Sequence, residues 1–532
     1  MRIRWIALAP VAFWGAGQCQ QAPPAITPGS IVNAASLMPG SLPGGVLPRG
    51  GLVAVYGPRL RADTVTIRAN DRTFAAVQVF QSDEYLTALL PGDLPAGDAL
   101  LSLTHQGQRS VDHPVQIANY APGLFAVRSP AFSCAEAQPF LDRRETIPRP
   151  SAFAPGAEAV LIATGASPAS QLLLAGQRVP LSTMADCQPG LQRFRFTIPA
   201  KLPPGCNLPL MVTAPDSTTS NYLTLPVKPC TPADTWLARA AASPDPLGFV
   251  LMVRSALRLE GKGKSAKDNF FDALLANFGA RMGPPDHPDF IWPPAGQCVS
   301  FSGTSAVAAL INEETVENAA RLEVEDFLTT IPRGPKFSLE YPMLENRDAG
   351  KELKVNGRSI PRHPKHQRFY YAPLGGNPPV KIIKPSPRYW TAGKYQMTGE
   401  GGADIGPFSL DVPFPDEPVW TNRDRIDSID RTRGVTLEWR GAGAAFILAT
   451  GIDNLDGGST LCLCVAPPKA RSFTIPPAAL ANLPSTLIPG SYYSLLGIAF
   501  APETEPPHVK TKGVGAIYAV PLSIVSKSVA IP

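Results

Sequence analysis

Long apolar runs and dense basic stretches are both missing from this sequence. The apolar run at residues 5–14 is about half the ~20 residues that a membrane-spanning helix needs. Charged residues make up 17% of the chain, and the net charge of +5 is spread over 532 residues. A nucleic-acid-binding face needs clustered Lys and Arg with aromatic residues between them, and the most basic stretch, residues 358–368, is interpreted as a solvated loop. We therefore expect no transmembrane span and no nucleic-acid partner.

A complete catalytic motif is also missing. The stretch from Phe301 to Ala309 is similar to the serine motif of subtilisin-like proteases, with Ser305 in the place of the nucleophile. A serine nucleophile needs a base and an orienting acid, but the motifs that supply the Asp and His in that family are absent. No catalytic residue is predicted.

Metal-binding residue types occur in two places. Asp286-His287-Pro288-Asp289 offers three ligands within four residues, but its prolines favour an exposed loop. Glu400, Asp404, Asp453 and Asp456 lie in glycine-rich turns where Ca²⁺ ligands would gather, yet the spacing of an EF-hand is missing and Asp and Gly are ordinary turn residues. We expect no metal and no cofactor.

Proline, in contrast, is abundant. The chain has 60 prolines and 45 glycines among 532 residues, and proline is thus about twice as frequent as its usual ~5% share. Because proline is excluded from helix interiors and central strands, the sequence predicts short elements joined by many turns. The length allows three or so domains, each with its own core, and a mainly β fold is expected.

The N-terminus has the form of a secretory signal. Arg2 and Arg4 precede the apolar run, and the small residues 15–17 follow it as a cleavage site. We predict a signal peptide over residues 1–19 and export of the mature chain. Cys19 raises the alternative of a lipid anchor, but the residue before a lipidated cysteine is normally small and here it is Gln18, so an anchor is not expected.

Beyond Cys19 there are seven cysteines, which export would place in an oxidising compartment. Four connect in one of three ways, of which we favour Cys134 with Cys187 and Cys206 with Cys230. Cys298 then pairs with Cys464 or with Cys462, leaving one spare thiol. The alternative is a zinc site, because Cys462 and Cys464 lie on one face of a strand, but no nearby pair of ligands completes it.

A repeated motif sets the domain register. Leu94-Pro95-Ala96-Gly97 recurs as Leu202-Pro203-Pro204-Gly205, 108 residues later, and Pro91 and Gly57 recur at the same offset as Pro199 and Gly165. Short alternating segments separated by turns every 8–12 residues predict an antiparallel β-sandwich in each copy. The predicted strands lie at residues 52–56, 64–69, 75–80, 85–90, 99–104 and 114–117, and at 157–163, 172–175, 194–198, 208–213 and 221–227.

Six separated motifs in this stretch keep a common order. They are Ile31-Val32-Asn33-Ala34-Ala35-Ser36, the strand end at Gly57, Asn119-Tyr120-Ala121-Pro122-Gly123-Leu124-Phe125, Ala163-Thr164-Gly165, Ile198-Pro199 with Leu202-Pro203-Pro204-Gly205, and Thr219-Ser220-Asn221. Together they resemble an uncharacterised immunoglobulin-like module of exported proteins from Solibacter-type acidobacteria. The resemblance covers about residues 29–228 and implies two immunoglobulin-like sandwiches, at 29–117 and 118–228. The segment from Cys134 to Cys187 departs from that family's form.

The third region is predicted to be β-rich with a few helices. After a linker at residues 229–245, apolar spacing predicts helices at Leu247–Leu259 and Asp268–Met282, the second with an apolar face. From Leu353 onward alternating strands are expected within a domain spanning residues 246–532. This region is similar to a companion domain of the same exported proteins, on the residues Gly399 to Phe408, Trp420-Thr421-Asn422, Ile429-Asp430-Arg431, Leu437-Glu438-Trp439 and Ser472 to Pro476. Neither resemblance implies an activity.

These features predict an exported, non-catalytic binding or structural protein of the cell surface or extracellular space, in which the modules present the C-terminal domain. Carbohydrate or protein is the expected partner, and Trp390 and Trp420, which lie near predicted loops, are the expected ligand-facing aromatics. The alternative is a secreted hydrolase acting on polysaccharide, which would need two carboxylates about 5–10 Å apart in a cleft lined by one of these tryptophans.

Overall fold

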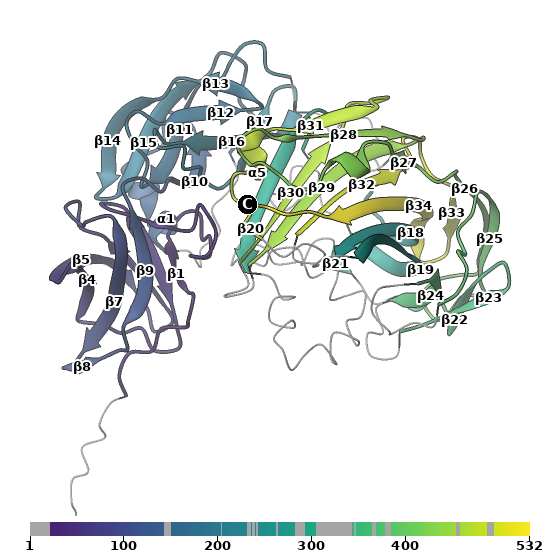
Figure 1. Ribbon diagram of the computed structural model, residues 1–532, viewed down its shortest axis with the longest axis horizontal. Coiled ribbons are helices and arrows are strands. Elements are labelled where there is room, and N and C mark those ends of the chain that lie inside the picture. Colours follow the sequence, from purple (N-terminus) through teal and green to yellow (C-terminus); the bar gives the residue numbers. More distant parts are fainter. Residues whose placement is uncertain are drawn as a thin grey trace, which may run out of the picture.

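The computed structural model describes residues 22–142, 150–203, 205–230, 236, 240, 243–261, 264–281, 293–304, 343–344, 347–363, 369–377, 385–453, 458–486 and 494–532. The protein is mainly β, as the proline-rich composition predicted. Figure 1 shows two β modules stacked at one side and a larger β region at the other. The predicted signal peptide and Cys19 lie outside the described residues. No helix among the described residues is long and apolar enough to cross a membrane.

The first module, residues 31–118, is one sheet bent around its own core. The described strands run in the order β1-β3-β6-β5-β4-β7-β9-β2, with β8 on β7. The long strand β5 pairs with β4 through its first half and with β6 through its second, so the sheet bends at this strand. The bent sheet encloses a core that includes Val53, Ile67 and Leu101. The strands are β1 (Ile31–Asn33), β2 (Leu47–Pro48), β3 (Leu52–Tyr56), β4 (Thr64–Ala69), β5 (Arg72–Gln81), β6 (Tyr85–Leu89), β7 (Gly97–His105), β8 (Gln108–Arg109) and β9 (His113–Ala118).

The second module, residues 123–227, is a sandwich of two sheets. One has the order β10-β11-β15-β14 and the other β13-β12-β16-β17, and alternate side chains such as Leu161, Phe194 and Leu210 fill the space between them. The elements are β10 (Gly123–Arg128), η1 (Cys134–Ala137), α1 (Gln138–Leu141), β11 (Glu158–Thr164), β12 (Gln171–Leu174), β13 (Gln177–Val179), β14 (Ser182–Gln188), β15 (Leu191–Thr197), β16 (Gly205–Thr213) and β17 (Leu223–Val227).

The repeated Leu-Pro-x-Gly shares several features between the two modules, although Gly97 has a φ of +120° and Gly205 is not in the positive-φ region. The N–H of Leu94 donates to the carbonyl oxygen of Pro91, and the N–H of Leu202 to that of Pro199. In both copies the glycine is the first residue of a strand, β7 or β16, and the leucine is buried. The motif is therefore a turn that leads into a core strand.

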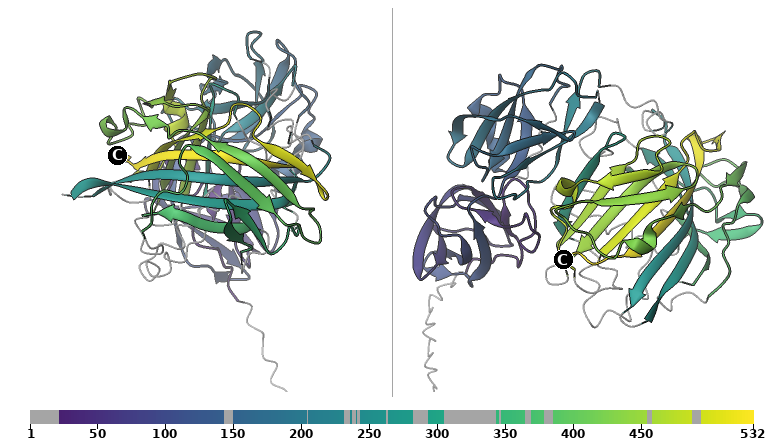
Figure 2. Two further views of the ribbon diagram at one scale, coloured as in Figure 1. Left: turned by 90° about the vertical axis from the view of Figure 1, so that its right-hand side faces the viewer. Right: turned by 45° about the horizontal axis from the view of Figure 1, so that its top comes forward.

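The C-terminal region is built on one large, twisted sheet (Figure 2). Its described strands run β20-β30-β29-β32-β34-β18-β19-β21, with β24 on β19 and β33 on β34. All pairs are antiparallel except β18 with β34, which are parallel. These strands are β18 (Leu247–Gly261), β19 (Lys264–Arg281), β20 (Cys298–Thr304), β21 (Met343–Leu344), β24 (Tyr370–Gly376), β29 (Ala444–Ile452), β30 (Gly458–Val465), β32 (Ser494–Ala501), β33 (His508–Thr511) and β34 (Val514–Ser528).

Two small sheets cover one face of the large sheet. The sheet β23-β22-β25-β26 packs on β18, β19 and β34 around a core that includes Trp390. The sheet β27-β28-β31 packs with α5 on β29, β30 and β32 around Trp439. On the opposite face Trp236, from the segment after the second module, packs against Tyr518. The covering elements are β22 (Glu352–Val355), β23 (Arg358–Pro361), β25 (Gly393–Gly399), β26 (Phe408–Phe414), β27 (Val419–Trp420), η4 (Arg423–Arg425), β28 (Val435–Arg440), β31 (Ser472–Ile475) and α5 (Pro477–Leu480).

The two helices predicted for this region are wrong, because residues 247–261 and 264–281 form the long hairpin β18–β19. Apolar residues four apart lie on one face of a helix, but they also lie on one face of a strand. Leu274 and Phe278 are buried under the small sheet, whereas Phe271 and Leu275 lie on the opposite face and are partly exposed. A strand that is apolar on both faces cannot be distinguished from a helix by spacing alone. Met282 lies outside the described residues.

Candidate functional site

Asn33, in the first of the six motifs that begin at Ile31, lies at the joint between the two modules. Its side chain is 1% exposed; Oδ1 accepts the N–H groups of Ala35 and Ser36, and Nδ2 donates to the carbonyl oxygen of Ala121 at 2.7 Å. Gly123 follows in the second module, and a Cβ there would lie 2.2 Å from Asn33 Oδ1. The two motifs therefore fit each other across the joint, and only glycine fits at position 123.

The Thr164-Gly165 motif contacts the first module from the opposite direction. The Oγ1 of Thr164 accepts the N–H of Leu52 at 2.8 Å. Gly165 has a φ of +66°, and a Cβ at that position would lie 2.4 Å from Cβ of Pro48. Its carbonyl oxygen accepts the N–H of Ala121. The backbone of the second module thus lies directly against the first.

A continuous apolar core fills the rest of this joint. It takes Val32 and Leu52 from the first module, and Phe125, Phe140 and Ile162 from the second, all at most 5% exposed. Beside it, Thr87 Oγ1 donates to the carbonyl oxygen of Leu141 at 2.8 Å. A shared core of this kind resists bending between modules, because bending would expose apolar surface to water.

Asn482 links the second module to the C-terminal region. It is 3% exposed; Thr219 Oγ1 donates to its Oδ1 at 3.2 Å, and its Nδ2 donates to the carbonyl oxygen of Ser220 at 3.3 Å. Gly44 of the first module lies at the same point, where a Cβ would be 2.6 Å from Asn482 Oδ1. All three parts of the protein therefore meet at one buried amide.

The third residue of this motif, Asn221, acts within the second module. Its Oδ1 accepts the N–H of Leu124 and its Nδ2 donates to the carbonyl oxygen of the same residue. Five of the motif residues, Asn33, Gly123, Thr164, Gly165 and Thr219, thus make contacts between parts of the protein. Sequence alone did not show that these residues meet.

Among the described residues the structure has three disulfides: the two pairs favoured from the sequence, and Cys298 with Cys464, which was one of its two predicted partners. Cys134–Cys187 ties η1 to β14, Cys206–Cys230 ties β16 to the end of the second module, and Cys298–Cys464 joins β20 to β30. Cys462 is buried and is the free cysteine among the described residues. Because Cys464 is in a disulfide, the alternative of a zinc site at Cys462 and Cys464 is wrong.

The prediction that Trp390 and Trp420 face a ligand is wrong. Trp390 is 0% exposed, stacks on Phe414 with ring centroids 5.3 Å apart, and donates from Nε1 to the carbonyl oxygen of Ala273. Trp420 is 5% exposed and donates from Nε1 to Asn422 Oδ1 at 2.8 Å. Both indoles are core residues whose polar edge finds a buried acceptor. Neither lines the cleft that the hydrolase hypothesis requires.

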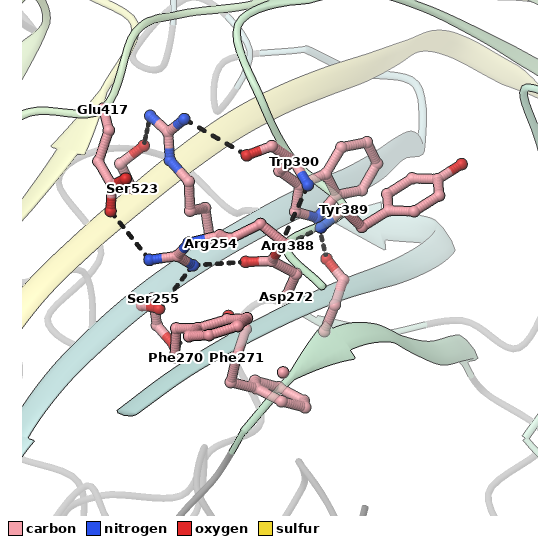
Figure 3. A network of polar contacts seen from close by, with 12 residues as sticks. Arg254, Ser255, Phe270, Phe271, Asp272, Arg388, Tyr389, Trp390, Glu417 and Ser523 are labelled. Atoms are coloured by element: carbon pink, nitrogen blue, oxygen red, sulfur yellow. Dashed lines mark hydrogen bonds and ion pairs between the residues drawn. The ribbon is translucent and has the colours of Figure 1, made fainter. Parts of the chain in front are cut away.

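The most concentrated polar chemistry lies beneath Trp390, where the small sheet meets the large one (Figure 3). Asp272 on β19 has a side chain that is 0% exposed. Its Oδ1 accepts from Arg388 at 2.7 Å, and its Oδ2 accepts the N–H groups of Tyr389 at 2.7 Å and Trp390 at 3.2 Å. Arg388 also donates to Glu417 Oε1 and to the carbonyl oxygen of Ser255.

Arg254 on β18 forms the second half of this network. It is 3% exposed and donates to the carbonyl oxygens of Trp390 and Asp416 and to Ser523 Oγ. Its guanidinium stacks over the ring of Phe414 at 4.8 Å. Burial lowers the pKa of Arg254, and the nearby Glu417 carboxylate opposes that shift. The guanidinium stays charged, because an arginine pKa starts above ~12.

More charged residues follow along the same side of the sheet. Lys527 on β34 has a fully buried side chain and pairs with Asp427 at 3.2 Å. Arg258 on β18 pairs with Asp424, whose pKa is lowered mainly by that hydrogen bond. The acidic partners Glu417, Asp424 and Asp427 all come from the segment at residues 415–427, which follows β26 of one small covering sheet and includes β27 of the other. Chemically, this network fixes that segment to the large sheet.

The remaining sequence candidates are scattered. Ser305, the stretch 286–289, Asp456, Lys365 and His366 lie outside the described residues. Glu400 pairs with Lys354, and Asp404 accepts the N–H of Asp348. Among the described residues, no three His, Cys, Asp or Glu side chains are grouped so that they could hold a metal ion.

A pocket of about 760 Å³ opens on the second module. The residues that line it lie within 128–140 and 150–158, from the end of β10 to the start of β11. The lining includes Phe132, Phe140 and Phe153, with Glu136 and Arg128 among them. The guanidinium of Arg128 stacks on Phe140 at 5.5 Å. The disulfide Cys134–Cys187 anchors this connection.

No protein-family model matches the chain, and no curated protein was found to resemble it. Among solved structures, the surface glycan-binding protein SGBP-B of Bacteroides ovatus, in complex with a mixed-linkage heptasaccharide, is 14% identical with a TM-score of 0.20, over 34% of this chain and 45% of that one. PbSGBP-B of Prevotella bryantii is 13% identical with a TM-score of 0.14, over 34% and 38%. The chain thus spans less than half of either protein. Domains 5–6 of the S-layer protein SbsC are 8% identical with a TM-score of 0.16, over 39% and 95%. With TM-scores this low, we base neither fold nor function on these likenesses.

Proposed function

We propose that this chain is an exported, non-catalytic binding or structural protein, in which two immunoglobulin-like modules hold the C-terminal region in a fixed orientation at the cell surface or in the extracellular space. The observation that carries the proposal is that residues of the six motifs described above lie at the joints between the parts of the protein. Asn33, Gly123, Thr164 and Gly165 make contacts between the two modules, and Thr219 binds Asn482 in the C-terminal region. Modules whose motif residues form the joints between them serve to position what they carry.

The disulfides support the location. Three bonded pairs among the described cysteines fit an oxidising compartment, since reducing compartments keep thiols unpaired. Export is tested by expressing the full chain and a variant without residues 1–19 in a bacterium with a periplasm. The full chain should appear outside the cytoplasm with its disulfides formed. Equal retention of both forms in the cytoplasm would contradict export.

The ligand in this proposal is a carbohydrate or a protein, and the pocket of the second module is the first place to test. Its lining combines phenylalanine and proline rings with the charged side chains of Arg128, Glu136 and Glu158, and its volume lies in the range of ~300–1,000 Å³ typical of ligand pockets. A glycan array with the purified protein identifies candidates. Ala154, which lines the pocket, and Ala169, which lies outside it, are both exposed alanines of this module.

Binding through this pocket should be weakened in Ala154→Trp, which adds a bulky indole to the pocket lining, and kept in Ala169→Trp. Equal binding by both variants would show that the ligand binds outside this pocket. The same glycans, incubated with the protein and assayed for new reducing ends, distinguish binding from hydrolysis. Release of reducing ends would favour the secreted hydrolase over the non-catalytic proposal.

A further inference from the structure

A short helical segment lies where the two modules meet (Figure 1). It consists of residues 129–142, called the joint segment below, which follow β10 and include η1 and α1. Its residues Phe140 and Leu141 are at most 2% exposed and belong to the same core as Leu52 of the first module. The first module also binds it through a hydrogen bond, because Thr87 Oγ1 donates to the carbonyl oxygen of Leu141 at 2.8 Å. The joint segment is therefore part of the contact that fixes one module on the other.

One disulfide ties the joint segment to the sheet of the second module. Helices shorter than ~12 residues are marginal in water on their own, and η1 and α1 have four residues each. The bond Cys134–Cys187 links η1 to β14. Near Cys187 the strand β14 is itself irregular, since its pairing with β15 shifts between Met184 and Gln188. Met184 and Cys187 also pack against the joint core. A single covalent bond therefore holds two irregular pieces of chain in place at the joint.

This disulfide is also the one that a reductant reaches most easily. Both Cys134 and Cys187 are partly exposed. Each of the other two disulfides among the described residues has a buried cysteine: Cys206 is 9% exposed, and Cys298 and Cys464 are 6% and 0% exposed. The rate of thiol–disulfide exchange depends on access to the sulfur that is attacked. A mild reductant should therefore reduce Cys134–Cys187 first.

We propose that Cys134–Cys187 is a redox-controlled lock on the joint between the modules, closed while the disulfide is formed and released by an external dithiol. In the reaction, one thiolate of the dithiol attacks one of the two bonded sulfurs, and the other cysteine leaves as a thiolate. The second thiolate of the reductant then attacks the mixed disulfide, and the reductant leaves with its own two sulfurs joined. The two cysteines take up two electrons and two protons. The lock acts on the joint and does not depend on what the protein binds.

Reduction lets the joint segment leave the joint by local unfolding. Parts of a native protein open separately, at a smaller cost in free energy than global unfolding, and a crosslink disfavours the open state because it restricts the conformations of the open chain. When the segment leaves, Phe140 and Leu141 leave the shared core and Thr87 loses its acceptor. Water then reaches the hydrogen bonds of the joint, such as the one from the Leu52 N–H to Thr164 Oγ1. The amide of Leu52 thus reports whether the joint is closed.

Titration of the full-length protein with dithiothreitol tests this lock. Alkylation and peptide mapping should show Cys134 and Cys187 labelled at concentrations that leave the other two disulfides bonded. Hydrogen–deuterium exchange on the same samples follows the joint. At those concentrations the amides of Leu52 and of the joint segment should exchange at least about tenfold faster, whereas β4, whose Ile67 lies in the core of the first module, should keep its protection. Reoxidation should restore the slow exchange.

Three results would overturn the proposal. One is earlier reduction of another disulfide, and a second is an unchanged Leu52 amide once Cys134 and Cys187 are labelled. The third is loss of protection in β4 together with Leu52, because the first module would then unfold as a whole rather than open at the joint.

Two double variants provide the controls. Cys206→Ser/Cys230→Ser removes a disulfide of the same module that lies outside the joint core, and it should keep both the slow Leu52 exchange and its response to dithiothreitol. Cys134→Ser/Cys187→Ser should exchange fast at Leu52 without reductant and show no further response. A response that persists in this second variant would assign the effect to another bond. If this variant fails to fold, the titration of wild type decides the matter by itself.

Discussion

Asp272→Asn should destabilise the C-terminal region far more than the matched change Glu417→Gln. Both residues accept from the same guanidinium, that of Arg388, and both changes remove one negative charge. The side chain of Asp272 is 0% exposed, whereas that of Glu417 is 49% exposed. The two variants therefore differ in the burial of the carboxylate that is replaced, while the partner Arg388 and the change in net charge are the same.

The magnitude follows from the hydrogen bonds of Asp272. An asparagine amide has one acceptor oxygen, so its NH₂ group must face either Arg388 or the N–H groups of Tyr389 and Trp390. In both orientations donors face donors in a buried site. Losing one or two charge-assisted bonds in this way costs about 2–4 kcal/mol. Glu417→Gln should cost only about 0–1 kcal/mol, as exposed ion pairs do.

Urea unfolding followed by tryptophan fluorescence measures both variants, with free energies from linear extrapolation of the transition that reports the C-terminal region. Trp390 packs in the core that this network borders, so its fluorescence follows the relevant transition. Equal losses in the two variants, or a loss below about 1 kcal/mol in Asp272→Asn, would refute the view that this buried network holds the small sheet on the large one.

Three further outcomes are expected. Gly165→Ala should lower the free energy of unfolding by about 2 kcal/mol or more, because it combines a left-handed backbone with a clash against Pro48. Gly176→Ala, with φ +80° and open space around it, should lower it by only about 1 kcal/mol. Thermal unfolding of both variants checks this, and similar losses of stability would argue against a tight module joint. Because the pKa of Asp424 is lower in the folded than in the unfolded protein, its ion pair stabilises the fold at pH values above the unfolded pKa of about 3.9, and this stability is lost as the pH falls through the folded pKa. The difference in urea midpoint between wild type and Asp424→Asn should thus shrink from pH 5 to pH 2. A constant difference would exclude this role. Alkylation of exported, unfolded, unreduced protein should label at most Cys462 and Cys19, so a third labelled cysteine in the intact mass would contradict the three disulfides.

Local patterns predicted many of the short strands, because these segments are alternating or rich in β-branched residues and are separated by turn residues. The segment at residues 64–69 is confirmed as β4, and 52–56 as β3. The same reasoning failed for β18 and β19, where strand pairing with the distant β34 decides the structure. Trp420 was assigned to the surface because turns surround it, but sequence does not show which turns are folded inward.

The buried polar network was missed, although a signal for it exists. Arg254, Asp272 and Lys527 are each the one charged residue of a five-residue stretch without other charges: Met252-Val253-Arg254-Ser255-Ala256, Phe270-Phe271-Asp272-Ala273-Leu274 and Ile524-Val525-Ser526-Lys527-Ser528. A charge in such a setting must be paired when it is buried. The partners Arg388 and Asp427 lie about 100 residues or more away in ordinary loops, with no pattern of their own. In each pair, the sequence pattern therefore identifies the charged residue in the strand but not its partner in the loop.

The parallel pairing of β18 with β34 has a consequence for how the chain is made. Val250 pairs with Ala519, so the centre of the large sheet stays incomplete until nearly the whole of this sequence has emerged. Both N-terminal modules, whose strands lie within residues 31–227, are free to fold long before that point. During the interval β18 presents an open strand edge, which invites pairing with other chains. Residues 247–261 are therefore the strand whose edge depends on the last long strand of the chain to cover it.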